Sequence, residues 1–403
     1  MPAALEGIRV IDLTVWFQGP VAAQHLADFG AEVIKVERPQ GGDQGRGVRS
    51  IKALPVGDWN QYFLVINRNK KSLALDLKKQ GGRDVMYRLV EKSDVFLSNM
   101  GIELLESWDL GYEKLSRVNP RLVYATNTGY GRFGQVNKPS FDMTVQALTG
   151  IMARLGEPAQ PPIYLGMGSG DAYGGLMSAL GIVLALYNRK RTGKGQWVDA
   201  SLYGAQLLLA GPAFQHYLAT TSDQFAKQQS RKAATNPLSN PYRAKDQWVF
   251  LCMPNDDESW GRLCRSLDGE GLAADPRFAT AEKRERSRRP LIRLLDGVIK
   301  RRTASDWMAR WKTQGVVASP VHTLADLAED PQAWENQYFV ETYCEEVQRQ
   351  VKVRGLPVGL SKTPGAVRSL GPELGQHTEE VLVETLGYSW EQVGELKEQG
   401  VIP

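Results

Sequence analysis

Short apolar runs alternate with amphipathic segments through the first half of the chain. The apolar runs are rich in β-branched residues and are typical of buried strands, whereas the segments between them space apolar residues three and four apart, as helices do. The strand-like runs are residues 7–14, 31–37, 72–77, 94–99, 122–128 and 196–202. The helix-like segments are residues 22–30, 81–92, 112–119, 176–189 and 203–218.

This alternation predicts an α/β fold with a mostly parallel sheet, because right-handed crossovers make successive strands parallel. Ligands of such sheets bind beyond the carboxyl ends of the strands. The loops expected there are residues 15–20, 38–60, 99–109 and 129–142. Glu37 ends the second strand, where a dinucleotide-binding fold places an acid against the ribose. The first turn lacks G-x-G-x-x-G, however, which disfavours a nicotinamide enzyme.

Two irregular stretches stand out from the alternation. Residues 41–58 are charged and glycine-rich, which predicts a long surface loop of the functional kind. Residues 161–181 (PPIYLGMGSGDAYGGLMSALG) place glycine at every second position before a single carboxylate, Asp171, and an apolar helix. Glycines permit sharp turns and close approach of the backbone. Asp171 is therefore either the N-cap of that helix or a reactive group.

The composition changes near residue 220, and a second domain follows. Its expected elements are a strand at 247–253 and helices at 260–267, 291–301 and 304–313. We predict a large domain at 1–219, a linker at 220–234, a small domain at 235–330 and, at 331–403, a second linker with a return to the large domain. The returning segment is expected to hold a strand at 338–344 and helices at 379–386 and 390–399.

Charge and composition exclude several classes of protein. Lys and Arg number 49 against 45 Asp and Glu, and their scatter along the chain disfavours nucleic-acid binding. The three cysteines and four histidines lack metal-ligand spacing, so no metal site and no disulfide framework is predicted. The most apolar run, residues 176–187, is short of the roughly 20 residues that span a membrane. We therefore predict a cytoplasmic protein with no membrane association.

Several segments in order resemble the family III CoA-transferases, the group of formyl-CoA transferase and carnitine CoA-transferase. The matching segments are residues 7–14 and 26–39, Gly42-Asp43 with Arg46, and residues 67–78, 109–131, 168–186, 191–202 and 372–389. The resemblance implies an open, Rossmann-like large domain built from both chain ends, a smaller α+β domain, and an interlocked dimer. Acyl-CoA and a carboxylic acid would be the substrates, with no permanently bound cofactor.

In that family the nucleophile is an aspartate before an apolar helix, which corresponds to Asp171. Its carboxylate would attack a thioester to give an aspartyl anhydride and then an aspartyl-CoA thioester. At an ordinary pKa the group is ionised at neutral pH and needs no base. Backbone N–H groups of residues 168–175 are expected to bind the oxyanion.

The resemblance also implies contacts with CoA. The corresponding residues are Phe17, Gln18, Arg38, Leu75, Lys78, Asn99, Phe141 and Asp142. Two departures affect this assignment. After the fourth strand the family has an Arg and a Pro that residues 99–102 (NMGI) lack, and the glycine loop of the small domain is MPNDDESW (253–260) here.

Three functional readings remain open. Acyl-CoA racemases resemble this fold but need a His where Phe141 stands, which favours the transferase. A non-catalytic CoA-binding subunit of a hetero-oligomer is the third. Aromatic residues in the expected pocket loops suit a bulky acceptor, and residues 16–24 and 253–260 resemble the branch that uses succinyl-CoA, such as benzylsuccinate CoA-transferase. A homodimer and a hetero-oligomer with a related subunit are both compatible with the chain.

Overall fold

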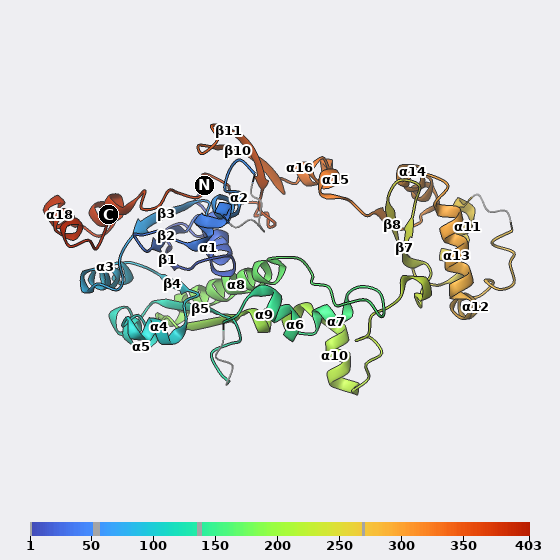
Figure 1. Ribbon diagram of the computed structural model, residues 1–403, viewed down its shortest axis with the longest axis horizontal. Coiled ribbons are helices and arrows are strands. Elements are labelled where there is room, and N and C mark those ends of the chain that lie inside the picture. Colours follow the sequence, from blue (N-terminus) through green and yellow to red (C-terminus); the bar gives the residue numbers. More distant parts are fainter. Residues whose placement is uncertain (1, 51–56, 135–138, 268–270) are drawn as a thin grey trace. The chain divides into compact units, whose positions relative to one another are not determined.

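The computed structural model describes residues 2–50, 57–134, 139–267 and 271–403 (Figure 1). The chain divides into two compact units, and each is described by itself. Unit 1 comprises Met1–Met152, Tyr164–Pro212 and Pro331–Pro403. Unit 2 comprises Ala153–Ile163 and Ala213–Asp330. Residues 153–163, which precede the glycine-rich stretch, thus belong to the second unit.

A six-stranded sheet, parallel throughout, forms the centre of unit 1. Its strands are β1 (Arg9–Leu13), β2 (Glu32–Glu37), β3 (Lys70–Ala74), β4 (Val95–Ser98), β5 (Val123–Thr128) and β6 (Trp197–Ser201). They lie in the order β3-β2-β1-β4-β5-β6, with every neighbouring pair parallel. The predicted parallel α/β sheet is confirmed. Its order is that of a doubly wound dinucleotide-binding fold, whose ligand crevice lies where β1 separates β2 from β4.

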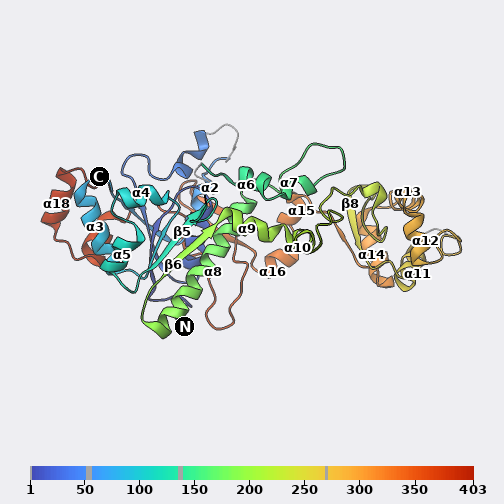
Figure 2. The ribbon, with the colours of Figure 1, turned by 90° about the horizontal axis from the view of Figure 1, so that it is seen from below.

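Helices cover both faces of this sheet. The described helices of unit 1 that precede α8 are α1 (Gln18–Asp28), α2 (Gln61–Ile66), α3 (Gln80–Glu91), α4 (Ile102–Ser107), α5 (Tyr112–Val118), α6 (Asp142–Leu148) and α7 (Ile151–Arg154). On one face, α1 and α8 (Ser169–Thr192) bury an apolar core against β1, β4 and β5. Figure 2 shows α8 beside β6. On the other face, α3 and α5 pack with the C-terminal residues.

By length and composition α8 is the one helix in the described ranges that could cross a membrane. Core helices of soluble proteins pass the same test, and here Ala179, Ile182 and Leu186 are buried in the core of unit 1. Near its end, Arg189 is buried and pairs with Asp94 at 2.7 Å. The helix is thus integrated into the sheet domain along one side.

The C-terminal segment returns to unit 1 and closes the edge of the sheet at β3. Its hairpin consists of β10 (Phe339–Cys344) and β11 (Arg349–Arg354), which pair antiparallel. The helices that follow are α17 (Thr378–Glu380), the π-helical turn η3 (Val381–Thr385) and α18 (Trp390–Glu398). The backbone N–H of Ala74 donates to Thr378 Oγ1 at 3.0 Å, and that of Asp76 donates to the Val401 carbonyl at 2.9 Å.

Unit 2 is a three-stranded antiparallel sheet packed against helices. The strands are β7 (Ser239–Arg243), β8 (Trp248–Cys252) and β9 (Ala318–Pro320), in that order. The helices of its core are α11 (Asp257–Ser266), α12 (Ala281–Arg286), α13 (Arg288–Ile299) and α14 (Ala304–Gln314). The stacked indoles of Trp307 and Trp311, 5.3 Å apart, are fully buried in this core. Unit 2 also contains the turn η2 (Arg231–Ala233) and the helix α15 (Leu324–Ala328), and α16 (Pro331–Glu335) begins the last segment of unit 1.

Three sequence predictions of secondary structure need correction. The third strand begins at Lys70 and ends at Ala74, because Asp76 already bonds to Val401 instead of β2. The helix expected at 203–218 is two helices, α9 (Leu202–Leu209) and α10 (Gly211–Thr220), since Gly211 has a φ of +65°. The loop expected at 41–58 contains a 3-10 helix, η1 (Gln44–Ser50); residues 51–56 lie outside the described ranges.

Candidate active site

Asp171 is the third residue of α8 and follows a turn built from glycines. Gly168 holds the N-cap position with a φ of +77°, a conformation that side chains rarely adopt. The helix-cap interpretation of Asp171 is therefore wrong, since the residue lies inside the first turn. In the described part of the chain its carboxylate forms no hydrogen bond, and it is partly buried. It is a free carboxylate at the positive end of a helix.

Burial raises the pKa of Asp171 to about 7, and the nearby charge of Asp142 acts in the same direction. The expectation that this group is ionised at an ordinary aspartate pKa is therefore wrong. Desolvation disfavours a charge, and a second carboxylate disfavours it further. The neutral acid of Asp171 is therefore favoured to a higher pH than that of an ordinary aspartate.

Asp142 is bound to the same turn. The backbone N–H groups of Gly168 and Gly170 lower the pKa of the Asp142 carboxylate, although burial raises it on balance. The carboxylate accepts hydrogen bonds from the side-chain amides of Gln206, at 2.9 Å, and Gln146, at 3.1 Å. Two of the amide groups expected to bind an oxyanion thus act on Asp142. Only 7% of the Asp142 surface is exposed, and its carboxylate is already engaged by the two glutamines.

Two aromatic rings lie on the other side of the turn. The Phe17 ring is within 3.6 Å of the position that a Cβ on Gly168 would take, and it lies 5.6 Å from the Tyr62 ring. Burial raises the pKa of Tyr62, and the negative charges of Asp171 and Asp43 raise it further. Tyr62, on α2, therefore lies in the electrostatic field of Asp171. Gln18 is buried, and its side-chain amide donates to the Ala200 carbonyl at 3.3 Å.

Asn99 joins the ends of β1 and β4, at the point where the strand order reverses. Its side chain accepts from the Val15 N–H at 2.9 Å and donates to the Val15 carbonyl at 2.7 Å. This amide pair fixes the backbone that leads into Phe17. Asn99 therefore has a structural role, because it connects the ends of β1 and β4. This role accounts for the residue without a direct contact to a ligand.

The remaining sequence-predicted residues differ in accessibility. Arg38 and Lys78 are exposed, and the Arg38 side chain donates to the Gly42 carbonyl at 3.0 Å. Phe141 is 61% exposed and immediately precedes α6. Leu75, by contrast, is 1% exposed and its side chain belongs to the core. Only the backbone of Leu75 can face a ligand.

A buried network of charges supports the crevice and was not predicted from the sequence. Lys35 pairs with Asp43 at 2.9 Å, and Asp43 in turn accepts the Trp16 N–H at 3.1 Å. Glu37 pairs with Arg46 at 2.8 Å. Although burial opposes it, Arg46 with Lys35 lowers the pKa of Glu37 to about 2. Glu37 is thus committed to Arg46, which agrees with the argument against a ribose-binding acid.

In unit 2 the segment 253–260 is held rigidly. The buried Arg284 donates to the Asn255 side chain at 2.8 Å and pairs with Asp257 at 2.7 Å. Asp256 caps α11 by accepting the Ser259 N–H at 2.7 Å. A segment fixed by these bonds differs from a mobile glycine loop.

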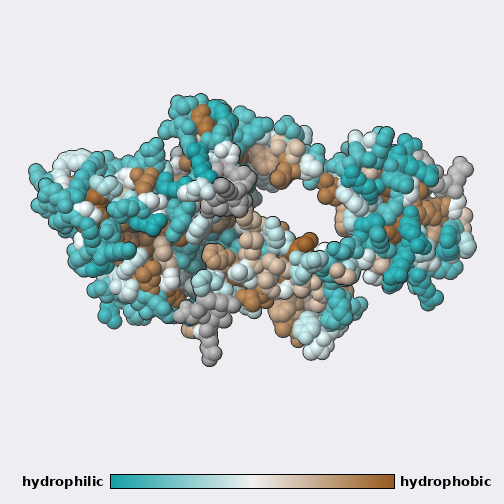
Figure 3. Space-filling view, in the orientation of Figure 1, coloured by the Kyte–Doolittle hydropathy of each residue, from teal (hydrophilic) through white to brown (hydrophobic). Residues whose placement is uncertain are grey.

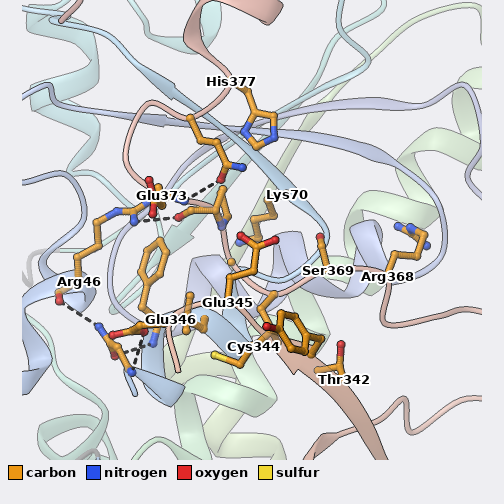
Figure 4. A pocket seen from close by; sticks show the side chains of 18 of the residues that line it. Arg46, Lys70, Thr342, Cys344, Glu345, Glu346, Arg368, Ser369, Glu373 and His377 are labelled. Carbon is orange, nitrogen blue, oxygen red and sulfur yellow. Dashed lines mark hydrogen bonds between the residues drawn. The ribbon is translucent and has the colours of Figure 1, made fainter. Parts of the chain in front are cut away.

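A cavity of about 840 Å³ opens in unit 1 among α2, β10 and the returning residues 368–377. Figure 4 shows Arg46, Lys70 and His377 around it. Its Lys and Arg side chains already have partners: Arg46 pairs with Glu37, Arg49 with Glu346 of the same lining, Lys70 with Asp12, and Arg368 donates to the Ala27 carbonyl. It contains none of the residues that the sequence assigned to substrate. Within the described ranges, no cluster of three His, Cys, Asp or Glu side chains could hold a metal ion.

The parallel sheet has its topological switch point between β1 and β4, and the carboxylate of Asp171 lies at the start of α8. The chain belongs to CoA-transferase family III, whose model matches residues 5–378. It is an enzyme of the CoA-transferase type.

Named relatives cover the whole chain. It is 32% identical over 411 residues to succinyl-CoA–D-citramalate CoA-transferase of Chloroflexus aurantiacus, covering 100% of this chain and 98% of that protein. It is 31% identical to the human succinyl-CoA:glutarate CoA-transferase, covering 99% of this chain and 90% of that protein. The crystal structure of a CaiB/BaiF family protein from Brucella suis matches with a TM-score of 0.85 at 30% identity, over 95% of this chain and 100% of that one.

Proposed function

We propose that this enzyme transfers CoA from succinyl-CoA to a dicarboxylic acid, with Asp171 as the covalent nucleophile. The observation that carries the proposal is the unpaired carboxylate of Asp171 in the first turn of α8, beside the crevice residue Phe17. The names of the citramalate and glutarate enzymes support succinyl-CoA as donor and a short dicarboxylic acid as acceptor. Benzylsuccinate, also a dicarboxylic acid, remains a candidate acceptor.

The reaction proceeds in four acyl transfers without net proton movement. An Asp171 oxygen attacks the thioester carbonyl, the C–S bond breaks, and CoA thiolate leaves a succinyl–aspartyl anhydride. The thiolate attacks the aspartyl carbonyl and releases succinate, which leaves an aspartyl-CoA thioester. The acceptor carboxylate then attacks this thioester, CoA thiolate departs, and its attack on the acceptor acyl group frees Asp171.

The chain's own residues orient this exchange. The exposed cations Arg38 and Lys78 suit the phosphates of CoA. Phe17 covers the glycine turn and keeps water from the anhydride. Burial of Asp171 makes its carboxylate a stronger nucleophile once it is ionised, because a poorly solvated anion has less hydration to lose.

A panel of acceptor acids tests the substrate assignment. The purified enzyme is incubated with succinyl-CoA and glutarate, mesaconate, citramalate, benzylsuccinate or carnitine, and the new thioester is identified by mass. We expect dicarboxylic acids to be converted and carnitine to be left unchanged. Exclusive use of a monocarboxylic acid would overturn the assignment.

Hydroxylamine tests the nucleophile. It should convert the acylated Asp171 of the wild type to a hydroxamate in the presence of succinyl-CoA, and the Asp171→Asn variant should give none. A non-catalytic CoA-binding subunit would give no hydroxamate in either protein. Deuterium exchange at the α-carbon of a 2-methylacyl-CoA separates the racemase alternative, since the Phe141 ring cannot accept a proton.

A further inference from the structure

Two glutamines hold the Asp142 carboxylate from opposite sides. Gln206, on α9, donates to Asp142 Oδ1 at 2.9 Å, and Gln146, on α6, donates to Oδ2 at 3.1 Å. Both glutamine side chains are fully buried. We call Asp142, Gln146 and Gln206 the carboxylate clamp. The sequence pointed to Asp142 alone, as a CoA contact.

The two glutamines are not equivalent. Gln146 uses its whole amide: Nε2 also donates to the Gly166 carbonyl at 3.1 Å, and Oε1 accepts the Leu165 N–H at 2.8 Å. Gln206 Oε1 is buried without a hydrogen-bond partner. Rotating its amide would bring Oε1 against the Asp142 carboxylate, so Nε2 has to face Asp142. A buried unpaired acceptor disfavours folding, and an apolar side chain would fit the rest of α9 (LYGAQLLL) better.

Gln206 also contacts the backbone of the turn. A Cβ added to Gly170 would lie 2.1 Å from Gln206 Nε2 and 2.2 Å from Asp142 Oδ1. Gly170 directly precedes Asp171. The Gln206 amide and the Asp142 carboxylate thus pack without a gap against the residue that precedes the nucleophile.

We propose that Gln206 is a positioning residue for Asp171. By donating to Asp142 it holds that carboxylate on the amide groups of Gly168 and Gly170, and this fixes the turn that presents the nucleophile. The inference rests on the proposed covalent role of Asp171. It explains why a helix that is otherwise apolar retains a buried amide with one unpaired atom.

The proposal predicts a change in the pH dependence of turnover, because Asp142 and Asp171 influence each other's pKa. Asp142 raises the pKa of Asp171, after burial, and burial raises the pKa of Asp142 itself while its four donors oppose that rise. Removing the Gln206 donor favours protonated Asp142, which removes a negative charge from beside Asp171. Replacing Gln206 with an acid adds a charge instead. The two variants should therefore move the rate profile in opposite directions.

The test compares Gln206→Met and Gln206→Glu with the wild type for succinyl-CoA turnover between pH 5 and 9. We expect Gln206→Met to lose ~10- to 100-fold in kcat with a small change in KM, a lower pH midpoint and an unchanged or higher Tm. Gln206→Glu should shift the midpoint upward. Wild-type kcat with a wild-type midpoint in Gln206→Met would overturn the proposal, as would shifts of both variants in one direction.

Two further variants separate positioning from a general loss of structure. Gln215→Met removes an exposed glutamine on α10 and should leave kcat, midpoint and Tm unchanged. The double variant Asp142→Asn with Gln206→Glu restores the hydrogen bond with donor and acceptor exchanged, and should recover kcat above either single variant. Losses that simply multiply would contradict action through Asp142.

Hydroxylamine trapping separates failure of this inference from failure of the proposed function. If the wild type forms the Asp171 hydroxamate and Gln206→Met forms it at the same rate, the positioning role of Gln206 alone is refuted. If the wild type forms none, the covalent role of Asp171 fails and the inference fails with it. A slower but detectable hydroxamate in Gln206→Met supports both.

Discussion

At the scale of single residues, the surroundings of Asp171 disfavour the ionised form that its proposed role requires. Burial and the charge of Asp142 favour the neutral acid, whereas attack on a thioester requires the carboxylate. The same desolvation that suppresses ionisation makes the anion more reactive. In the proposed mechanism, burial therefore lowers the fraction of Asp171 that is ionised and raises the reactivity of the ionised form, and pH determines that fraction.

The pH dependence of turnover follows from this balance. We expect kcat/KM for succinyl-CoA to rise with pH as one proton is lost, with a midpoint at about 7, the pKa of Asp171. Initial rates between pH 5 and 9 measure it, and a return to pH 8 after incubation at pH 5 controls for inactivation. A profile that is flat from pH 5 to 8 would contradict the assignment.

The raised pKa of Asp171 should also affect the free energy of unfolding. The pKa of Asp171 is raised from 3.8 to about 7 in the folded chain, so the folded state binds the proton more tightly than the unfolded one. The charge becomes unfavourable as pH rises from 4 through 7. Asp171→Asn removes it, and should raise the unfolding free energy at pH 8 by up to ~4 kcal/mol. Urea unfolding at pH 8 and pH 4 tests this, with no gain expected at pH 4.

Some of these residues could be predicted from the sequence, and others could not. Asp171 follows a recognisable glycine pattern in the local sequence, whereas Phe17 was singled out by the family resemblance. Gln146 lies four residues after Asp142 on α6, a spacing that helical geometry encodes, whereas Gln206 reaches Asp142 from α9, and spacing along the chain does not encode that contact. The one available signal was a lone amide in the apolar run of α9. The raised pKa of Asp171 likewise depends on burial, which no local pattern reports.

At the scale of elements, the turn before α8 is held more tightly than glycine content alone suggests. Its backbone groups at Leu165, Gly166, Gly168 and Gly170 interact with the side chains of Gln146 and Asp142, both on α6. A glycine-rich turn is therefore not a flexible one here. The glycines permit close packing and the bonds fix it.

Gly170→Ala should abolish activity. The new methyl group would overlap Gln206 Nε2 and Asp142 Oδ1, both nearer than 2.5 Å, and the turn would have to move. We expect at least ~100-fold loss in kcat, together with a lower Tm. Gly394→Ala in α18 is the matched control, since its Cβ meets nothing within 4 Å, and it should stabilise the protein by ~0.5–1 kcal/mol. Full activity in Gly170→Ala would contradict the packing described.

The periodic elements were predicted well and the short ones were missed. Strands β1, β2, β4, β5 and β6 and helix α3 have clear apolar periods, and each lies where it was expected; helices α1 and α8 were also expected but begin four and seven residues earlier, at Gln18 and Ser169. Helices α2, α4 and α6 have six or seven residues, too few for a period to be visible. Strand β11 (RQVKVR) is charged and half exposed, so its partner β10 determines it more than its own composition.

At the scale of the whole molecule, α8 leaves an apolar face uncovered. The exposed residues on it are Leu176, Leu180, Val183, Leu184 and Tyr187. In Figure 3, brown and pale-brown residues gather in the region of α8 and α9. Exposed apolar patches of this kind mark association surfaces. We propose that a second copy of the chain covers this face, as the family resemblance implies.

Leu184→Glu tests the association. Leu184 is 59% exposed, so the substitution removes no core packing but places a charge in the proposed interface. We expect the wild type to be a dimer by light scattering and the variant to be largely monomeric and inactive. Lys114→Glu, at an exposed position of α5 on the other face of the sheet, is the control and should remain dimeric. A wild-type monomer with full activity would contradict the proposal.

The hydrogen bonds between β3 and the returning C-terminal residues have a consequence for biosynthesis. The Ser72 hydroxyl oxygen accepts the backbone N–H of Gly375, 303 residues further along the chain, and the backbone N–H of Asp76 donates to the Val401 carbonyl. On the ribosome, the strand that borders the sheet emerges long before the residues that cover it. During most of its translation the nascent chain therefore exposes β3 as an edge strand with unpaired backbone groups. Chains that terminate early would keep this edge exposed permanently. Such fragments are the expected clients of holding chaperones and the expected seeds of insoluble protein during overproduction.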